Sequence, residues 1–451
     1  MLNYKVEDNI AIISFNMTDT PMNVLNEASI AALDAQTSKA IADDSIVGVI
    51  ITSDKKEFIA GADLNMILQH STLQTQKVMI TDLHRVFRKY EASGKTFVAA
   101  INGTILGGGY EVCLACHHRI AVNEPKTLIG LPEMLIGLFP GGGGTQRLPR
   151  MIGFEKALDF ILKGGKVSPE KALEIGLVDA LANTREEMIT QAKAWIVANP
   201  RSLQPWDKKD NDGKISGKAD FAIPFESVTS ANGEKLLNTQ KTGNYPAPLA
   251  IMQCMYKGLQ VPIEEGLAIE IDYFAQVATS KEARNMVKTV FFAMNEVNKE
   301  LRTKNILLAD AFADYIKSVS DVYSEERKLM LKEGISPVLI ENACKNAGMT
   351  VFNFSAEELE IKVQLLENQP SEEELKKRIL YIQAIQAKKC LKQNVITSVR
   401  DADVASVLGF GFPAYTGGAL SYVDYVGEDV FAQEANRLAS VYGERFKILF
   451  N

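Results

Sequence analysis

The sequence predicts an α/β domain at the N-terminus followed by an all-helical C-terminal part. Short β-branched runs alternate with helical patterns as far as about Ala198, which is typical of βαβ units around a parallel sheet. Helical patterns resume at Leu249 and continue through the rest of the chain. At 451 residues the chain is too long for a single core. We therefore predict an α/β domain at 1–198, a loop-rich linker at 199–248, connecting helices at 249–304, and two helical repeats at 305–370 and 371–451.

The composition excludes several classes of protein. Apolar residues make up 46% of the chain and charged residues 23%, which is ordinary for a soluble globular protein. A formal net charge of -7 argues against a nucleic-acid partner. Five cysteines, an odd number, are expected to be reduced thiols. The polar start of the chain resembles no signal peptide, and no apolar run is long enough for an integral membrane segment, so we expect a cytoplasmic location.

The first elements are predicted from local signals. Tyr4–Val6 and Ile10–Phe15 read as a hairpin that turns at Asp8-Asn9, and Asn26 is expected to cap the next helix. The further elements expected are a strand at 46–52, a helix at 73–92, and strands at 97–101 and 120–123. Binding sites in such sheets form at the carboxyl ends of the strands.

The segment Ile101–Arg119 has the strongest chemical signal. It follows a buried strand and contains the glycine turn Gly107–Gly109, which leads into a short helix. A strand, a glycine turn and a helix start gather backbone N–H groups and a positive dipole end, and Glu111 lies in the first helical turn. This pattern predicts an oxyanion site with a carboxylate beside it. Four consecutive glycines at 141–144 indicate a second place where the backbone approaches a neighbour closely.

Three motifs together resemble the enoyl-CoA hydratase/isomerase (crotonase) family. They are Ala60-Gly-Ala-Asp63, Gly107-Gly-Gly-Tyr-Glu111, and Leu131-Pro-Glu133 continuing through Pro140-Gly-Gly-Gly-Gly-Thr-Gln-Arg147. Their order and spacing match the family along about 190 residues, whereas any one alone is a weak signal. The resemblance implies a crotonase-like α/β fold built from ββα repeats.

The resemblance also implies roles for individual residues. The backbone N–H groups of Ala62 and Gly108 would form the oxyanion hole for a thioester carbonyl. Glu111 would activate water and Glu133 would donate the proton, a pair with divided protonation. Substrate contacts would come from Ala60, Asp63, Gly107 and, toward the CoA phosphates, Lys56. Alone, Glu111 would be read as a solvated helix-start residue and Lys56 as a solvated loop residue; the linked motifs favour a site role for Glu111 and leave Lys56 open.

Other motifs in the N-terminal half suggest metal or haem sites that we reject. Cys113-Leu-Ala-Cys116-His117 fits a haem-attachment pattern and His118 adds a zinc ligand type, but the motif follows a buried strand on a helix, so packing is the better interpretation. The contacts of His117 stay open, because relatives usually carry an acid there. Asp210 and Asp212 suggest a calcium loop, but Lys208 occupies the first ligand position. We expect no metal.

The C-terminal half extends the resemblance to the bacterial multifunctional fatty-acid oxidation alpha-subunit family. Glu270–Lys299 is similar to its long connecting helix, with a capping box at Thr279–Glu282 and an apolar stripe that includes Phe291. The regions 323–349 and 378–425 are similar to the helical repeats of its 3-hydroxyacyl-CoA dehydrogenase C-terminal type. Lys332-Glu-Gly-Ile335 and Lys392-Gln-Asn-Val395 form a faint repeat, and Ser371 begins a second capping box.

The NAD-binding Rossmann domain of that family is missing from this sequence. The nearest candidate phosphate loop, Gly409–Ala414, follows a helical stretch and contains Pro413. All four histidines precede residue 119, so the dehydrogenase-like part has no imidazole for hydride transfer. We therefore expect no cofactor and no dehydrogenase activity. The predicted function is hydration of 2-enoyl-CoA in fatty-acid β-oxidation, with 3-enoyl to 2-enoyl isomerisation as a related activity. The alternative is a non-catalytic scaffold that binds a thiolase beta subunit.

Overall fold

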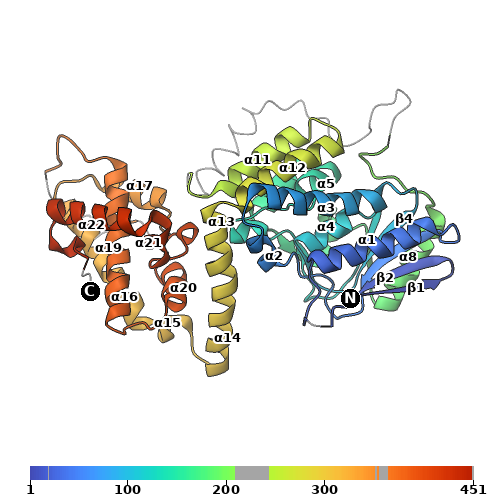
Figure 1. The fold of residues 1–451 in the computed structure, drawn as a ribbon, viewed down its shortest axis with the longest axis horizontal. Helices are drawn as coiled ribbons and strands as arrows, with labels where there is room; N and C mark the ends of the chain where they lie inside the picture. Colours follow the sequence, from blue (N-terminus) through green and yellow to red (C-terminus); the bar gives the residue numbers. More distant parts are fainter. Residues whose placement is uncertain (19, 209–242, 351–352, 355–363, 449–451) are drawn as a thin grey trace. The chain divides into compact units, whose positions relative to one another are not determined.

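The computed structural model describes residues 1–18, 20–208, 243–350, 353–354 and 364–448. The chain divides into two compact units (Figure 1). The N-terminal unit comprises the described residues of Met1–Asn232 and Ala247–Thr279, and the C-terminal unit those of Gly233–Pro246 and Ser280–Asn451. The division falls inside the segment predicted as connecting helices, 249–304. Among the described residues, no helix is both long and apolar enough to cross a membrane.

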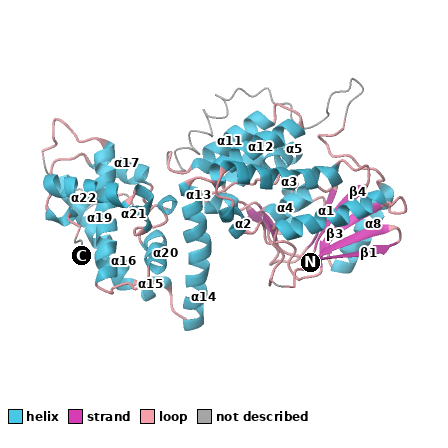
Figure 2. Ribbon diagram, in the orientation of Figure 1, coloured by secondary structure: helices cyan, strands magenta, loops and turns pink. Residues whose placement is uncertain are grey.

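The N-terminal unit is built on a six-stranded sheet, drawn in magenta in Figure 2. Its strand order is β1-β2-β3-β4-β6-β9, with β1 antiparallel to β2 and all other neighbours parallel. A second sheet of three short strands has the order β5-β7-β8. The strands are β1 (Leu2–Glu7), β2 (Ile10–Phe15), β3 (Gly48–Ser53), β4 (Thr96–Ile101), β5 (Ile105–Leu106), β6 (His118–Val122), β7 (Ile129–Gly130), β8 (Lys166–Val167) and β9 (Ala180–Ala182).

The helices of this unit lie between strands along the chain or after the last strand, and helices cover both faces of the sheet. They are α1 (Glu27–Ala42), α2 (Leu64–Gln69), α3 (Leu73–Glu91), α4 (Gly108–Leu114), η1 (Glu133–Ile136), α5 (Gly144–Ile152), α6 (Phe154–Leu162), α7 (Pro169–Ile175), α8 (Arg185–Ala198), α11 (Pro246–Gly258) and α12 (Ile263–Ala278). Because helices cover both faces, every residue of β2, β3 and β4 is buried.

The register of the central strands explains one layer of the core. Ile12 pairs with Ile50, and Ile50 pairs with Val98, so these three side chains form one row on the same face. That row packs in a cluster with Met188, Ala192 and Ile196 of α8. The sheet and α8 therefore fix the carboxyl ends of β3 and β4, from which the loops that carry the predicted motifs emerge.

Several local predictions for this unit are confirmed. Asp8 and Asn9 turn the β1–β2 hairpin with φ of 52° and 58°, as a type I′ turn requires. Asn26 caps α1 by accepting from the Ser29 N–H at 2.9 Å, and the Ser29 hydroxyl accepts from the Asn26 N–H. The predicted strands at 46–52, 97–101 and 120–123 correspond to β3, β4 and β6, and the helix at 73–92 corresponds to α3.

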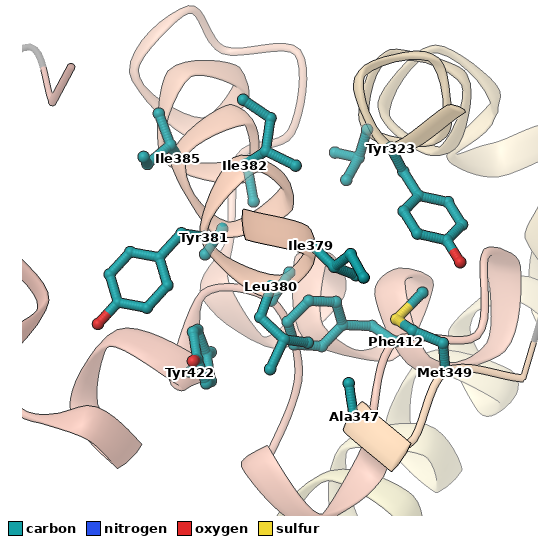
Figure 3. Packing of buried hydrophobic residues seen from close by; sticks show 14 of the residues in the cluster. Tyr323, Ala347, Met349, Ile379, Leu380, Tyr381, Ile382, Ile385, Phe412 and Tyr422 are labelled. Atoms are coloured by element: carbon teal, nitrogen blue, oxygen red, sulfur yellow. The ribbon is translucent and has the colours of Figure 1, made fainter. Parts of the chain in front are cut away.

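The C-terminal unit is helical (Figure 2). Its buried core gathers side chains from α16, α17 and α19 together with Phe412 and Tyr422 (Figure 3). The buried face of α19 contributes Leu375, Ile379 and Ile382 to this core. The elements are α13 (Lys281–Met286), η3 (Val287–Ala293), α14 (Met294–Lys304), α15 (Leu308–Ala311), α16 (Ala313–Lys332), α17 (Pro337–Ala347), α19 (Glu372–Lys392), α20 (Val399–Gly409), η4 (Ala414–Thr416), α21 (Ser421–Val426), α22 (Glu428–Tyr442) and η5 (Glu444–Phe446).

Two details of the predicted connecting helix were wrong. The segment 270–299 is not one helix, because α12 ends at Ala278 and α13 begins at Lys281. The cap of α13 is Ser280, whose hydroxyl accepts from the Ala283 N–H at 3.2 Å. Thr279 instead donates its hydroxyl back to the Ala275 carbonyl at 2.7 Å and closes α12. The neighbouring serine is therefore the cap.

The apolar stripe behind that cap is also displaced. Residues Val287–Ala293 form a π-helical turn, which holds one more residue per turn than an α-helix. The extra residue shifts the buried face, so Phe291 is exposed and Thr289 is buried. The Thr289 hydroxyl donates to the Gly417 carbonyl at 2.8 Å. A strict helical period therefore predicted the wrong residue at this position.

The faint repeat corresponds to two similar helix ends. Gly334 follows α16 with φ of 85°, and the Ile335 N–H bonds to the Met330 carbonyl at 3.1 Å. Asn394 follows α19 with φ of 56°, and the Val395 N–H bonds to the Cys390 carbonyl at 2.9 Å. Both helices thus end in a left-handed residue and the same backbone bond. Ser371 caps α19 through the Glu374 N–H, as predicted.

The remaining predictions for this part are decided only in part. The Gly409–Ala414 segment begins at the last residue of helix α20 and does not follow a strand, which agrees with our rejection of a phosphate loop there. The predicted linker 199–248 contains the first residues of α11, which begins at Pro246. The rejected calcium loop lies outside the described residues, apart from Lys208.

Candidate active site

The glycine turn between β5 and α4 presents the first part of the site. Gly107 has φ of 55° and ψ of -133°, a conformation that L-residues with a side chain rarely adopt. Its N–H donates to the Gly130 carbonyl at 2.9 Å, which attaches the turn to the small sheet. Its carbonyl accepts from the Tyr110 and Glu111 N–H groups and so starts α4. The turn fixes both the first N–H of α4 and the direction of Glu111.

The two predicted oxyanion-hole residues lie side by side. A Cβ built on Gly108 would lie 3.5 Å from the Ala62 backbone nitrogen and 3.7 Å from the Ala62 Cβ. Ala62 is held in a bridge to Leu25 through the Gly61 carbonyl and the Asp63 N–H, so the bridge does not use the Ala62 N–H. Among the described residues, no backbone hydrogen bond uses the N–H of Ala62 or of Gly108. The arrangement leaves two neighbouring donors available to a ligand.

Glu111 is buried and firmly held. It is 2% exposed, and its Oε1 accepts from the Gly142 and Gly144 N–H groups, each at 2.7 Å. Burial raises the pKa of Glu111 well above its ordinary value of 4.5. The negative charges of Glu133 and Glu270 raise this pKa further, and the two N–H bonds oppose the rise. The four-glycine loop is therefore a cradle for this carboxylate, which explains its close backbone approach.

Glu133 begins η1 and faces the glycine turn. A Cβ built on Gly107 would lie 2.9 Å from Glu133 Oε1, so the absence of a side chain at Gly107 makes room for this carboxylate. Oε2 is buried and has no hydrogen-bond partner among the described residues. Burial raises the pKa of Glu133 to about 8, opposed by its own backbone N–H and increased by the charge of Glu270. An acid with this pKa holds its proton at neutral pH and can deliver it.

Glu270 is a third buried carboxylate, which the sequence analysis did not assign to the site. It lies on α12 and is 0% exposed. Its Oε1 accepts from the Gly143 N–H at 2.6 Å, and its Oε2 accepts from the Thr145 N–H at 3.1 Å and from the Thr145 hydroxyl. A signal was present, because Glu270 interrupts an apolar stripe with the spacing of Ile263, Leu267 and Phe274. A lone acid on a buried stripe requires a specific partner.

A buried ion pair between Arg147 and Glu91 supports the four-glycine loop. Arg147 and Glu91 are both fully buried, and Nε and Nη2 of Arg147 donate to the two carboxylate oxygens at 2.9 Å each. Arg147 Nη1 also donates to the Gly142 carbonyl at 3.2 Å. Glu91 also accepts hydrogen bonds from Trp206 Nε1 at 3.1 Å and from Arg88 Nη1 at 2.8 Å. Arg147, at the end of the Thr145-Gln-Arg147 run, therefore helps to hold the loop that holds Glu111.

The other predicted substrate contacts have different surroundings. Ala60 donates its N–H to the Asn23 carbonyl at 2.8 Å, on the same loop as Ala62. Asp63 is the cap of α2 and accepts from the Asn65 N–H at 2.9 Å. Lys56 is exposed and lines a cavity of about 410 Å³ together with Lys55, Gly103 and Arg185. The site around Glu111 thus gathers Ala62, Gly107, Gly108 and Glu133, whereas Lys56 lines this separate cavity.

The cysteine–histidine motif is packing, as predicted. Cys113 and Cys116 are 0% exposed, and burial raises the pKa of Cys116 to about 12. His117 Nδ1 accepts from the Phe97 N–H at 3.0 Å, and Nε2 lies 3.1 Å from the Glu91 carbonyl oxygen, which settles its contacts. His118 stacks on Trp195 with ring centroids 4.3 Å apart. Over the described residues, no group of three or more His, Cys, Asp or Glu side chains is arranged to hold a metal ion.

Comparisons with known proteins point to the same family as the motifs. Residues 5–205 match the enoyl-CoA hydratase/isomerase family. The chain is 36% identical over 297 residues to the fatty acid oxidation complex subunit alpha of Shewanella baltica strain OS185, and 38% identical over 302 residues to that of Shewanella amazonensis. In each case the match covers 65% of this chain and 41% of the relative, so it spans less than half of the length of these relatives.

A solved structure of similar description was also found. The crystal structure of enoyl-CoA hydratase from Bacillus halodurans is similar over 64% of this chain and 98% of its own, at 19% identity and a TM-score of 0.47. The assignment rests on the sequence matches. They confirm the predicted crotonase-like α/β fold for the N-terminal part, while the C-terminal part is helical. Residues 5–205 are therefore similar in sequence to the enoyl-CoA hydratase/isomerase family, the family that the three motifs also resemble.

Proposed function

We propose that the N-terminal unit adds water to 2-enoyl-CoA thioesters, a step of fatty-acid β-oxidation. One observation carries the proposal: two carboxylates with raised pKa values, Glu111 and Glu133, lie at the glycine turn, where two backbone N–H groups have no backbone partner in the part of the chain that the structure describes. Donors of this kind stabilise the charge that develops on a thioester oxygen, by about 3 to 4 kcal/mol for each donor. Acid and base groups beside them supply the proton transfers that hydration needs.

The proposed reaction follows from these positions. The Ala62 and Gly108 N–H groups hold the thioester oxygen. We assign the one negative charge of the acid pair to Glu111, because its Oε1 accepts two backbone N–H bonds that favour the carboxylate. Glu111 takes a proton from water while the water oxygen bonds to C3, and the double-bond electrons move to the thioester oxygen as an enolate. Glu133, as the acid, then gives its proton to C2 as the enolate returns to a carbonyl. The product is a 3-hydroxyacyl-CoA, and the proton taken by Glu111 restores Glu133 through exchange with solvent.

The same groups support isomerisation of a 3-enoyl to a 2-enoyl thioester. Removal of a C2 proton by one carboxylate gives a dienolate whose oxygen would be held by the same two N–H groups. Protonation of this dienolate at C4 by an acid then moves the double bond to C2–C3 and restores the thioester carbonyl. We propose this as a related activity of the one site, because enolate stabilisation serves both reactions. The acyl-CoA is the substrate in both cases, and neither reaction needs a redox cofactor.

For the C-terminal unit we propose no NAD binding and no dehydrogenase activity. The sequence has no histidine after residue 118, so this unit cannot supply the imidazole that such hydride transfer uses. Its helices resemble the dehydrogenase C-terminal repeats, and the matching ends of α16 and α19 support a repeated architecture.

A second candidate role is that of a scaffold. The relatives' name states that they are subunits of a complex. The thiolase beta subunit that we propose as the partner is what the family resemblance implies. Binding to a thiolase in size-exclusion chromatography, with no turnover of enoyl-CoA, would favour the scaffold over the enzyme.

The hydratase proposal is tested with a panel of substrates. Loss of enoyl-thioester absorbance is followed with crotonyl-CoA and longer 2-enoyl-CoA esters, and its appearance with 3-enoyl-CoA. We expect turnover of 2-enoyl-CoA. A 3-hydroxyacyl-CoA with NAD is expected to give no NADH, and NADH formation would overturn the proposal for the C-terminal unit.

A further inference from the structure

Two carboxylates share one run of backbone N–H groups in the glycine loop. The N–H groups of Gly142 and Gly144 point to Glu111, while those of Gly143 and Thr145 point to Glu270. The partners therefore alternate along four successive residues at the start of α5. Backbone N–H groups at a helix start stabilise negative charge, and here they serve two acids at once. A displacement of one carboxylate therefore changes the loop that holds the other.

The glycine loop is packed closely against Glu111 and against α12, the helix that carries Glu270. Gly143 has φ of 103°, and a Cβ on Gly142 would lie 2.7 Å from Glu111 Oε2. A Cβ on Gly141 would lie 2.4 Å from the Phe274 ring, one turn beyond Glu270 on α12. The helix α12 packs against α5 and α3, so Glu270 approaches the loop from a rigid element.

Titratable groups from every neighbouring element face Glu270. His84 of α3 is 5% exposed, and its Nε2 lies 3.3 Å from Glu270 Oε1. Neither ring nitrogen of His84 has a hydrogen-bond partner among the described residues. The negative charge of Glu270 acts to raise the pKa values of Arg150 on α5 and Cys254 on α11. It acts in the same direction on the pKa values of Glu111 and Glu133. Glu270 thus interacts both with the acid pair, Glu111 and Glu133, and with buried side chains of α3, α5 and α11.

We propose that Glu270 is a positioning residue for the acid–base pair: it holds the Gly142–Thr145 loop that presents Glu111. The proposal rests on the proposed function, because it assigns Glu270 a part in the same reaction. It acts through the loop and through its charge, and it does not contact the reacting atoms.

The first test compares Glu270→Gln and Glu270→Ala with Glu265→Gln. Glu265 is exposed on the same helix and loses the same charge, so it is a matched control. We expect Glu270→Ala to lower kcat by about 100-fold with little change in KM, since a misplaced catalytic group costs about that factor. Glu270→Gln keeps the shape and one acceptor, so we expect a smaller loss, about 10-fold.

The pH profile distinguishes this role from a merely structural one. The charge of Glu270 raises the pKa of Glu133, so its removal lowers that pKa. We therefore expect the alkaline limb of kcat to move to lower pH in Glu270→Gln and to stay in place in Glu265→Gln. An unchanged kcat and an unchanged alkaline limb in Glu270→Gln would overturn the proposal.

A second measurement does not depend on turnover. Carboxyl carbons labelled with ¹³C-glutamate are titrated by NMR, with the Glu133 signal assigned by its loss in Glu133→Gln. In the parent protein Glu133 is expected to titrate near a pKa of about 8, and in Glu270→Gln at a lower value. A parent that turns over no enoyl-CoA would contradict the proposed function, whereas an unshifted Glu133 titration in Glu270→Gln would overturn only the role of Glu270.

Discussion

Arg147 and Glu91 form a fully buried, two-pronged ion pair beneath the glycine loop. The same guanidinium reaches the carbonyl of Gly142, whose N–H is bonded to Glu111. Both backbone polar groups of Gly142 are therefore held, its N–H by Glu111 and its carbonyl by Arg147. A site that must hold a buried carboxylate in a defined direction needs such support, because its own glycines contribute no side-chain packing.

Removal of one member of this pair is expected to destabilise the N-terminal unit. Arg147→Met removes the bidentate partner of the buried Glu91 carboxylate, and we expect the free energy of unfolding to fall by about 3 to 5 kcal/mol. The matched control is Lys163→Met, which removes the exposed pair with Asp159 and costs about 0 to 1 kcal/mol. Urea unfolding followed by tryptophan fluorescence reports on this unit, because both tryptophans, Trp195 and Trp206, lie in it. Equal midpoints for the two variants would refute the structural role of the pair.

Substitution of Gly107 by alanine is expected to abolish most of the activity. A Cβ there would lie 2.9 Å from Glu133 Oε1, and the backbone has φ of 55°. We expect kcat/KM to fall by about 100-fold, since the acid must move. Gly94→Ala is the control, because Gly94 also has a positive φ, 76°, but no atom lies within 4 Å of its added Cβ. Similar losses in both variants would show that the effect comes from backbone strain and not from displacement of Glu133.

The raised pKa of Glu133 predicts a pH-dependent stability. The folded state has a pKa of about 8 and the ordinary value is 4.5, so the folded protein binds this proton more tightly. The stabilising contribution is fully present below pH 4.5 and is lost as the pH rises toward 8. We expect the free energy of unfolding to fall more steeply over this window in the parent than in Glu133→Gln. Urea titrations at each pH check this, and parallel curves would contradict it.

The buried thiols are expected to be unreactive in the folded protein. All five cysteines are buried, and burial raises the pKa of Cys113 well above its ordinary value and that of Cys116 to about 12. A disulfide reagent is therefore expected to modify five thiols in denaturant and none at once in the native state. Val197→Cys places a thiol at a site that is 69% exposed and serves as a positive control. Immediate reaction of Cys113 and Cys116 would contradict the packing role.

The local chemistry of the site could be predicted from sequence where one short segment determines it. Local residue types predict the Asp8-Asn9 turn, the Asn26 cap and the Gly107 turn, because few residue types are favoured in these conformations. The spatial approach of Ala62 to Gly108 was predicted only through the family resemblance, since 46 residues separate them and their meeting depends on the sheet.

Features that depend on tertiary contacts were missed. Glu270 lies far along the chain from the glycine loop, and two of its partners are backbone N–H groups, which have no sequence signature. The cap at Ser280 and the exposure of Phe291 depend on a competing bond of Thr279 and on a π-helical turn. The period of apolar residues identifies a helix, but it does not reveal the extra residue that a π-helical turn inserts into that helix.

The most direct test of the account is the rate of crotonyl-CoA hydration in Glu111→Gln and Glu133→Gln. Each substitution keeps the shape of the side chain and removes an acid or base that is worth about 10²- to 10⁴-fold in rate. Glu186→Gln, on an exposed turn of α8, is the control and is expected to keep the parental rate. We predict that the parent turns over and that both site variants lose at least about 100-fold in kcat. Parental rates in both site variants, or no hydration by the parent protein, would contradict the assignment of Glu111 and Glu133 as the acid–base pair.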